Sequence, residues 1–132
     1  MTVLERSNPS DLHQPDGYSH ITVSPAGRMI HFAGQCPVDI DDHVVGDDFL
    51  TQTDQVIANC MAVLAAAEVK PDAVVRSLVY VVSGDSADLS AVWRRLMDSP
   101  LAPAFTTAST LLGVTALGYR GQLVEVDLTA AG

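Results

Sequence analysis

The fold is decided by one strand, VVRSLVYVV at residues 74–82. β-Branched residues dominate this stretch and turn-forming residues flank it, which is the pattern of a strand inside a sheet. Both of its faces are largely apolar, so each face needs a cover. We therefore expect helices on one face of the sheet and a further subunit on the other.

Two amphipathic helices flank that strand in the sequence. Residues 49–67 repeat apolar side chains every three or four positions, which predicts a helix of about five turns. Residues 88–97 predict a second helix, whose apolar stripe is formed by Leu89, Val92, Trp93 and Leu96. The neighbouring Arg94 and Arg95 are expected to turn outward into solvent. Two helices can cover only one face of a sheet of this size, so we expect a closed homo-oligomer to cover the other.

Four further strands complete the predicted order β-β-α-β-α-β-β. They are predicted at residues 21–23, 29–35, 105–112 and 123–129. The turn at 24–27 between the first two predicts a hairpin. In the last strand, Glu125 and Asp127 alternate with apolar residues, so we expect both carboxylates to point away from the helices and toward a subunit boundary. The result is an α+β protein with a single mixed sheet and two helices packed on one face.

Length and composition limit what the protein can be. The 132 residues make one domain, spanning 1–132. A net charge of −9 repels polyanions, so nucleic acid is not an expected partner. The apolar runs are far shorter than a membrane span needs, and residues 1–11 lack the apolar core of a secretory signal. We therefore expect a cytoplasmic protein whose two thiols, Cys36 and Cys60, stay reduced and buried.

The sequence holds none of the common catalytic or metal-binding motifs. There is no phosphate-binding glycine loop, zinc-protease helix, Cys-x-x-Cys pair or nucleophile elbow. The acidic segment 39–48 lacks the spacing of a calcium loop, and the four histidines lack the spacing of a zinc site. A nucleophilic pair of Cys36 with His20 or His31 has no orienting signature, so a buried thiol is favoured. We expect neither a metal ion nor an organic cofactor.

Six short stretches stand out in order along the chain. They are DGYSH at 16–20, AGQCPVD at 33–39, QTDQ at 52–55 with Asn59 and Leu64, VYV at 79–81, PAFTT at 103–107 and VEV at 124–126. Each stretch alone is a weak signal. Together, and over nearly the whole chain, they resemble the Rid family, which is also called the YjgF/YER057c/UK114 or endoribonuclease L-PSP family.

The resemblance implies a fold, an assembly and a chemistry. It implies a chorismate-mutase-like fold in a homotrimer, with small-molecule sites in the clefts between subunits. The best-known members hydrolyse reactive enamines and imines, such as 2-aminoacrylate, to a carbonyl product and ammonia without a cofactor. In those members an arginine of a Pro-Ala-Arg motif holds the substrate carboxylate bidentately. A glutamate on the last strand and a bound water carry out the addition.

The sequence departs from the family at that arginine, whose position is taken by Phe105. Deamination of the standard 2-imino acids is therefore not the expected activity. The resemblance assigns a catalytic role to Glu125 and substrate-binding roles to Tyr18, Gly34, Trp93, Phe105 and Thr107. A replacement cation from Arg120, in the loop before the last strand, is an alternative to the simpler interpretation of a solvated arginine.

Two functions of different classes fit these residues. In the first, the chain hydrolyses a small enamine, imine or related C–N compound with Glu125 and a water, and Phe105 selects a substrate without a carboxylate. In the second, the chain is a non-catalytic trimer that binds a small molecule or a regulatory partner, and Phe105 fills a disused pocket. The ribonuclease activity attributed to some relatives is disfavoured by the net charge of −9.

Overall fold

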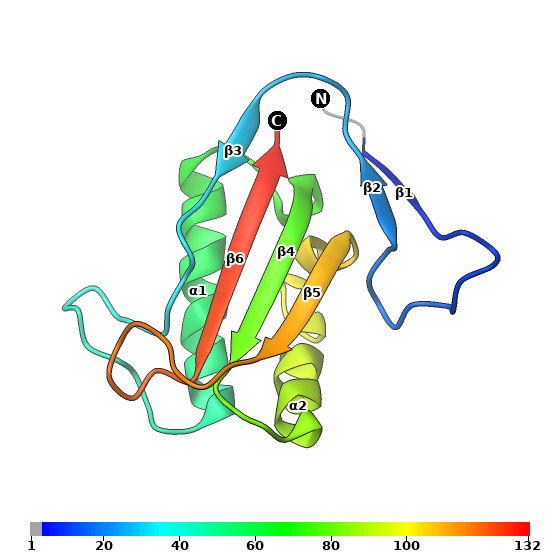
Figure 1. The fold of residues 1–132 in the computed structure, drawn as a ribbon. Coiled ribbons are helices and arrows are strands. Elements are labelled where there is room, and N and C mark those ends of the chain that lie inside the picture. The colour runs from blue at the N-terminus through cyan, green and yellow to red at the C-terminus, as the bar shows by residue number, and fades with distance from the viewer. Residues whose placement is uncertain (1–3) are drawn as a thin grey trace.

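A four-stranded sheet and two helices form the main body of the fold in residues 4–132, which are the residues that the computed structural model describes. The sheet has the order β3-β6-β4-β5, with β3 at Met29–His31, β6 at Val124–Ala131, β4 at Val74–Val81 and β5 at Ala108–Gly113. Strand β4 pairs with β5 in parallel and with β6 antiparallel, so the sheet is mixed. The predicted α+β class and mixed sheet are confirmed (Figure 1).

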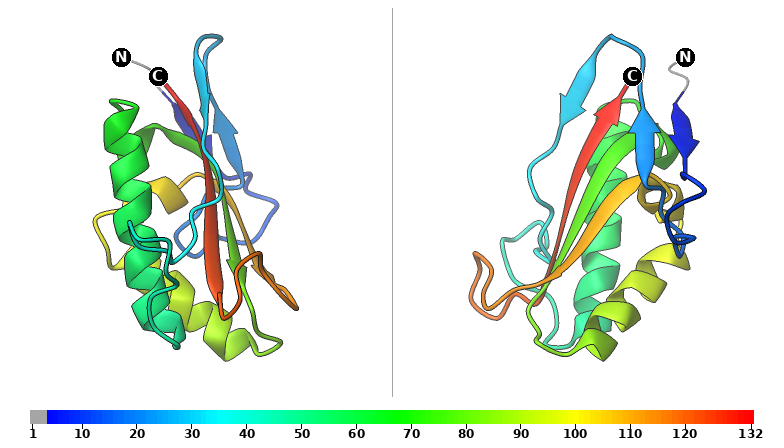
Figure 2. Two further views of the ribbon diagram at one scale, coloured as in Figure 1. Left: turned by 90° about the vertical axis from the view of Figure 1, so that its left-hand side faces the viewer. Right: turned by 45° about the vertical axis from the view of Figure 1, so that its right-hand side comes forward.

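Both helices cover the same face of this sheet (Figure 2). Helix α1 spans Phe49–Ala66 and helix α2 spans Ser86–Met97. The Asp48 carboxylate caps α1 by accepting a hydrogen bond from the Thr51 amide at 2.8 Å, and Asp85 accepts one from the Ala87 amide at the start of α2 at 2.9 Å. Within residues 4–132, neither helix is long and apolar enough to cross a membrane.

The core lies between the helices and the sheet. Strands β4 and β6 send alternate side chains into it, and the fully buried ones include Val79, Val81, Val124 and Val126. Glu125 and Asp127 lie on the opposite face of β6, as predicted, and both are half-buried. In the described part of the chain, that opposite face carries no helix (Figure 2).

The first two predicted strands do not form a hairpin. Strand β2, Ile21–Val23, pairs with β1, Glu5–Ser7, in a separate two-stranded sheet, whereas β3 pairs with β6 (Figure 1). The sequence of β1 is ERS, which has no apolar alternation, so this partner of β2 could not be recognised. The predicted hairpin is therefore wrong, and the sheet is accompanied by a small second one.

The two-stranded sheet is anchored to the start of β5. The Ser19 amide donates to the Thr107 carbonyl at 3.1 Å, and the Thr22 hydroxyl accepts from the Ala108 amide at 2.9 Å. These contacts hold the segment that contains Tyr18 against the edge of the four-stranded sheet.

Two of the predicted strands are shorter in the structure. The strand expected at 29–35 ends at His31 and returns only as a bridge between Gln35 and Val126, whose amides and carbonyls pair at 2.7 and 3.0 Å. The strand expected at 105–112 begins at Ala108, because Ala102–Phe105 form a short 3-10 helix with a proline near its start. The interruption at 32–34 places Gly34 beside Glu125.

Candidate functional site

Glu125 lies on β6 with its carboxylate held in a fixed position. Its Oε1 accepts a hydrogen bond from Gln122 Nε2 at 3.1 Å and another from the Cys36 thiol at 3.3 Å. Its Oε2 lies against the backbone of Gly34, so close that a Cβ atom there would overlap it. Gly34 therefore makes room for the carboxylate. Within residues 4–132, Oε2 makes no hydrogen bond, so this oxygen is available to a water or a ligand.

The thiol of Cys36 is a hydrogen-bond donor in this arrangement. Burial, the hydrogen bond to Glu125 and the negative charge of that residue together raise its pKa to about 11, and burial contributes most. A thiol with such a pKa is protonated near neutral pH, so it supports Glu125 and is a poor nucleophile. Cys60 lies in the core, where burial raises its pKa to about 12. Both cysteines are free, although Cys36 is only half-buried.

Polar side chains of α1 hold the loops around Glu125. The Asn59 amide donates to the carbonyls of Cys36 and Val38, both at 2.9 Å. Gln52 is fully buried; it donates to the Gly121 carbonyl at 2.9 Å and accepts from the Leu123 amide at 2.7 Å. These contacts give a structural reason for the polar positions of α1 that stood out in the sequence.

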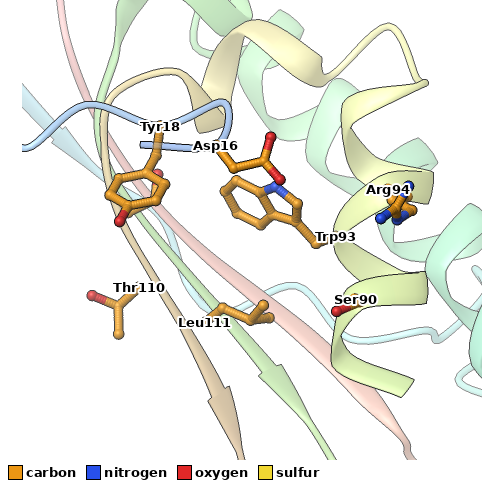
Figure 3. Close-up of a pocket in the computed structure, with 8 residues that line it drawn as sticks. Asp16, Tyr18, Ser90, Trp93, Arg94, Thr110 and Leu111 are labelled. Atoms are coloured by element: carbon orange, nitrogen blue, oxygen red, sulfur yellow. The ribbon is translucent and has the colours of Figure 1, made fainter. Parts of the chain in front are cut away.

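A cleft of about 460 Å³ lies at the open edge of β5, between that strand and α2 (Figure 3). Its lining includes Asp16, Tyr18, Ser90, Trp93, Arg94 and Thr110. Of the predicted substrate-binding residues, the cleft brings together Tyr18 and Trp93, whose rings meet edge to face with centroids 6.5 Å apart. An aromatic surface with polar groups at its rim is typical of a small-molecule site.

Phe105 and Thr107 are fully buried, and neither lines the cleft. Phe105 packs edge to face on Trp93, with centroids 5.7 Å apart, and so holds the indole in place. The Thr107 hydroxyl donates to the Val75 carbonyl at 2.9 Å and also meets the Thr22 hydroxyl. Direct contact of Phe105 or Thr107 with a ligand stays a prediction, because neither side chain lines the cleft of the single chain.

The two adjacent arginines of α2 have different surroundings. Arg95 forms an ion pair with Asp54, with nitrogen–oxygen distances of 2.7 and 2.8 Å. Arg94 is exposed, as predicted, but it lines the cleft. Its spacing from Ser90 and Trp93 places all three on one face of the helix, and this spacing is the signal that sequence analysis missed. Arg120 is exposed on the loop before β6.

The cleft lies at the edge of the sheet, and Glu125 is not among the residues that line it. Helix α2 supplies one wall of the cleft, whereas Glu125 points to the face that carries no helix within residues 4–132. Strand β4 also separates β6 from β5 in the sheet order. A single chain therefore does not bring the two together. Among the described residues, no three His, Cys, Asp or Glu side chains gather closely enough to hold a metal ion.

The fold, the carboxylate seated on a glycine and the aromatic cleft at the sheet edge define a small protein of the chorismate-mutase-like class. Residues 10–132 match the family described as endoribonuclease L-PSP. The chain belongs to this family, as the six stretches of its sequence predicted.

Two relatives are 34% identical to this chain. Protein DfrA of Myxococcus xanthus matches over 116 residues, which are 86% of this chain and 83% of that protein. The crystal structure of YyfB of Yersinia pestis, a protein of unknown function from the conserved Rid family, covers 96% of this chain and 97% of its own, with a TM-score of 0.85.

A more distant structure supports the fold alone. Rv2704 of Mycobacterium tuberculosis, a member of the YjgF/YER057c/UK114 family, is 22% identical with a TM-score of 0.62 and covers 97% of this chain and 98% of its own.

Proposed function

We propose that this protein hydrolyses a small reactive enamine, imine or related C–N compound to a carbonyl product and ammonia. The observation that carries the proposal is the carboxylate of Glu125, which has one oxygen fixed by Gln122 and Cys36 and the other free at the protein surface. Membership of the endoribonuclease L-PSP family supports the reaction class. The two free thiols fit a reducing, cytoplasmic location.

The proposed chemistry needs one carboxylate and one water. An enamine first tautomerises to its imine. Oε2 of Glu125 takes a proton from a water whose oxygen attacks the imine carbon, the electron pair of the C=N bond moves to nitrogen, and Glu125 passes the proton on to that nitrogen. In the resulting carbinolamine, Glu125 carries the hydroxyl proton to the amino nitrogen, the C–N bond breaks to release ammonia, and the C–O bond becomes the carbonyl. Each proton that Glu125 takes is passed on, so the carboxylate is regenerated without a metal ion or an organic cofactor.

We further propose that the complete site lies between two copies of the chain in a closed homotrimer. Within one chain Glu125 does not line the cleft, and β4 lies between β6 and β5, so a second copy is needed to bring a Glu125 carboxylate to a cleft. Leu78 and Leu112 share the sheet face of Glu125, and Leu112 is 37% exposed. Covering these side chains favours association across that face.

Phe105 acts on the cleft indirectly, through its contact with Trp93. Because it is fully buried against Trp93, the position of the family arginine offers no cation to a ligand. This observation also favours the second candidate function, in which the trimer binds a small molecule without converting it.

Ammonia release from freshly generated imines tests the proposal. Wild type is expected to accelerate hydrolysis, and Glu125→Gln is expected to slow it by roughly 100-fold or more. Asp127→Asn is the matched control, since Asp127 occupies the same face of β6 two residues away, and it should retain activity. If no imine is hydrolysed faster with wild type than without it, the protein is a binding module and the hydrolase proposal is wrong.

A further inference from the structure

The seven Lys and Arg side chains of the sequence differ in what they contact. Four of them donate to other parts of the protein, namely Arg6, Arg28, Arg76 and Arg95. Within residues 4–132, the side chains of Lys70, Arg94 and Arg120 make no hydrogen bond or ion pair. Only Arg94 of these three lines the aromatic cleft. Its guanidinium is therefore the cation that a ligand in the cleft would meet.

The surroundings of Arg94 form a recognition site with three distinct parts. The indole of Trp93 is held edge to face by Tyr18 on one side and by Phe105 behind it, so it offers a fixed apolar surface. Figure 3 shows Arg94 on the side of Trp93 away from Tyr18, and the carboxylate of Asp16 beside the indole. The cleft thus presents a cation, an anion and an aromatic surface together.

We propose that Arg94 is the anion-binding residue of this cleft, and that it holds the carboxylate of a ligand whose planar, apolar body packs against Trp93. A guanidinium forms two parallel hydrogen bonds to a carboxylate, which fixes orientation as well as position. The inference rests on the proposed function for the reaction that follows binding. It places the cation on α2, whereas the family motif would place it at position 105.

Two features of the charge distribution narrow the class of ligand. The net charge of −9 repels anions in general, so an anion needs a local cation to bind. The Asp16 carboxylate in the same cleft disfavours a ligand with several negative charges, such as a phosphate ester. A monocarboxylate that also carries an N–H group suits both Arg94 and Asp16, because its carboxylate can accept from Arg94 and its N–H can donate to Asp16. A volume of about 460 Å³ accommodates such a molecule with an aromatic side chain.

The test uses the single tryptophan of the sequence as a reporter. Trp93 fluorescence is measured while 3-phenylpropanoate is titrated into wild type, Arg94→Gln, Arg94→Lys and Arg95→Gln. The uncharged 3-phenylpropanamide, which has almost the same shape, is titrated in parallel. Arg95→Gln removes the same charge from the neighbouring position and is the matched control, since Arg95 is engaged with Asp54 outside the cleft.

We expect wild type to bind the carboxylate more tightly than the amide. Arg94→Gln should weaken carboxylate binding by about tenfold or more and leave amide binding unchanged, because a hydrogen bond between charged groups is lost. The affinity of Arg94→Lys for the carboxylate should lie between those of wild type and Arg94→Gln. Arg95→Gln should bind the carboxylate as tightly as wild type does. Equal weakening by Arg94→Gln and Arg95→Gln, or no binding of 3-phenylpropanoate to wild type, would overturn the inference.

The same variants separate this inference from the proposed function. If carboxylate binding depends on Arg94 but no imine is hydrolysed, the hydrolase proposal fails and the anion site stands. If hydrolysis depends on Glu125 while Arg94→Gln changes neither carboxylate binding nor the KM of a carboxylate-bearing imine, the anion site is wrong and the hydrolase proposal stands.

Discussion

Oε2 of Glu125 lies against Gly34, in space that the first side-chain carbon of any other residue would occupy. The close approach depends on the interruption between β3 and the bridge at Gln35, where the chain leaves the regular ladder. Position 34 and the carboxylate of position 125 are therefore coupled directly.

The first prediction concerns that contact. Gly34→Ala should displace the Glu125 carboxylate, because its oxygen is the nearest atom to the new methyl group. A small misplacement of a catalytic group is costly, so we expect imine hydrolysis to fall by about tenfold to 100-fold with little change in Tm. Gly27→Ala is the control, since a Cβ at Gly27 has no heavy atom within 4 Å. Equal activity of the two variants in the ammonia assay would contradict this account of Gly34.

The second prediction concerns pH. The pKa of Cys36 is raised from 9.0 to about 11 in the folded protein, so its protonated form favours folding. This contribution is fully present below about pH 9 and is lost as pH rises toward 11. Cys36→Ser should therefore lose less stability between pH 8.5 and 10.5 than wild type does, as measured by urea unfolding. Parallel pH profiles for the two proteins would show that the thiol does not titrate as described.

The third prediction concerns Phe105. Phe105→Ala should lower the free energy of unfolding by about 3–5 kcal/mol, because it leaves a cavity behind Trp93. The emission of Trp93 should shift to longer wavelength as water reaches the indole. Phe105→Arg should also be destabilising, since it would bury a charge without a partner. Leu12→Ala, at a side chain that is 51% exposed, should change stability by less than about 0.5 kcal/mol. A stable, wild-type-like Phe105→Arg would show that position 105 can open toward a ligand.

The fourth prediction concerns the anchor of the two-stranded sheet. Thr107→Val removes the hydroxyl that donates to the Val75 carbonyl and meets Thr22, so we expect a loss of about 1–3 kcal/mol in unfolding free energy. Thr107→Ser keeps the hydroxyl and should recover most of that loss. Thermal unfolding of the two variants measures this difference in stability. A Thr107→Val protein as stable as wild type would rule out a structural role for this hydroxyl.

Periodicity was enough to predict the main elements of the fold. The strand at 74–82, the helix at 49–67 and the alternation around Glu125 all appear in the structure, because each buries one apolar stripe or face. The pairing of β2 with β1 was not predictable, since β1 has only three residues and a polar sequence. Short strands of this kind are defined by their tertiary partners.

The candidate site was predicted only in part. Glu125, Gly34, Tyr18 and Trp93 came from the resemblance, and the structure pairs the first two with each other and the last two with each other. The support of Glu125 by Cys36 is a contact between residues 89 positions apart, which no local pattern can show. Arg94 was predicted to be merely solvated, because a helical wheel shows exposure but does not show what lies opposite an exposed side chain.

The complete site is proposed to be shared between two copies of the chain, and mixing two inactive variants tests this sharing most directly. Glu125→Gln lacks the carboxylate, and Ser90→Trp blocks the cleft with a bulky side chain at an exposed position of α2. Each variant alone should be inactive. After unfolding and refolding together in equal amounts, random assembly should restore about a quarter of wild-type ammonia release, because one site in four combines an intact cleft with an intact Glu125. A mixture that assembles into mixed oligomers but stays inactive would contradict a shared site.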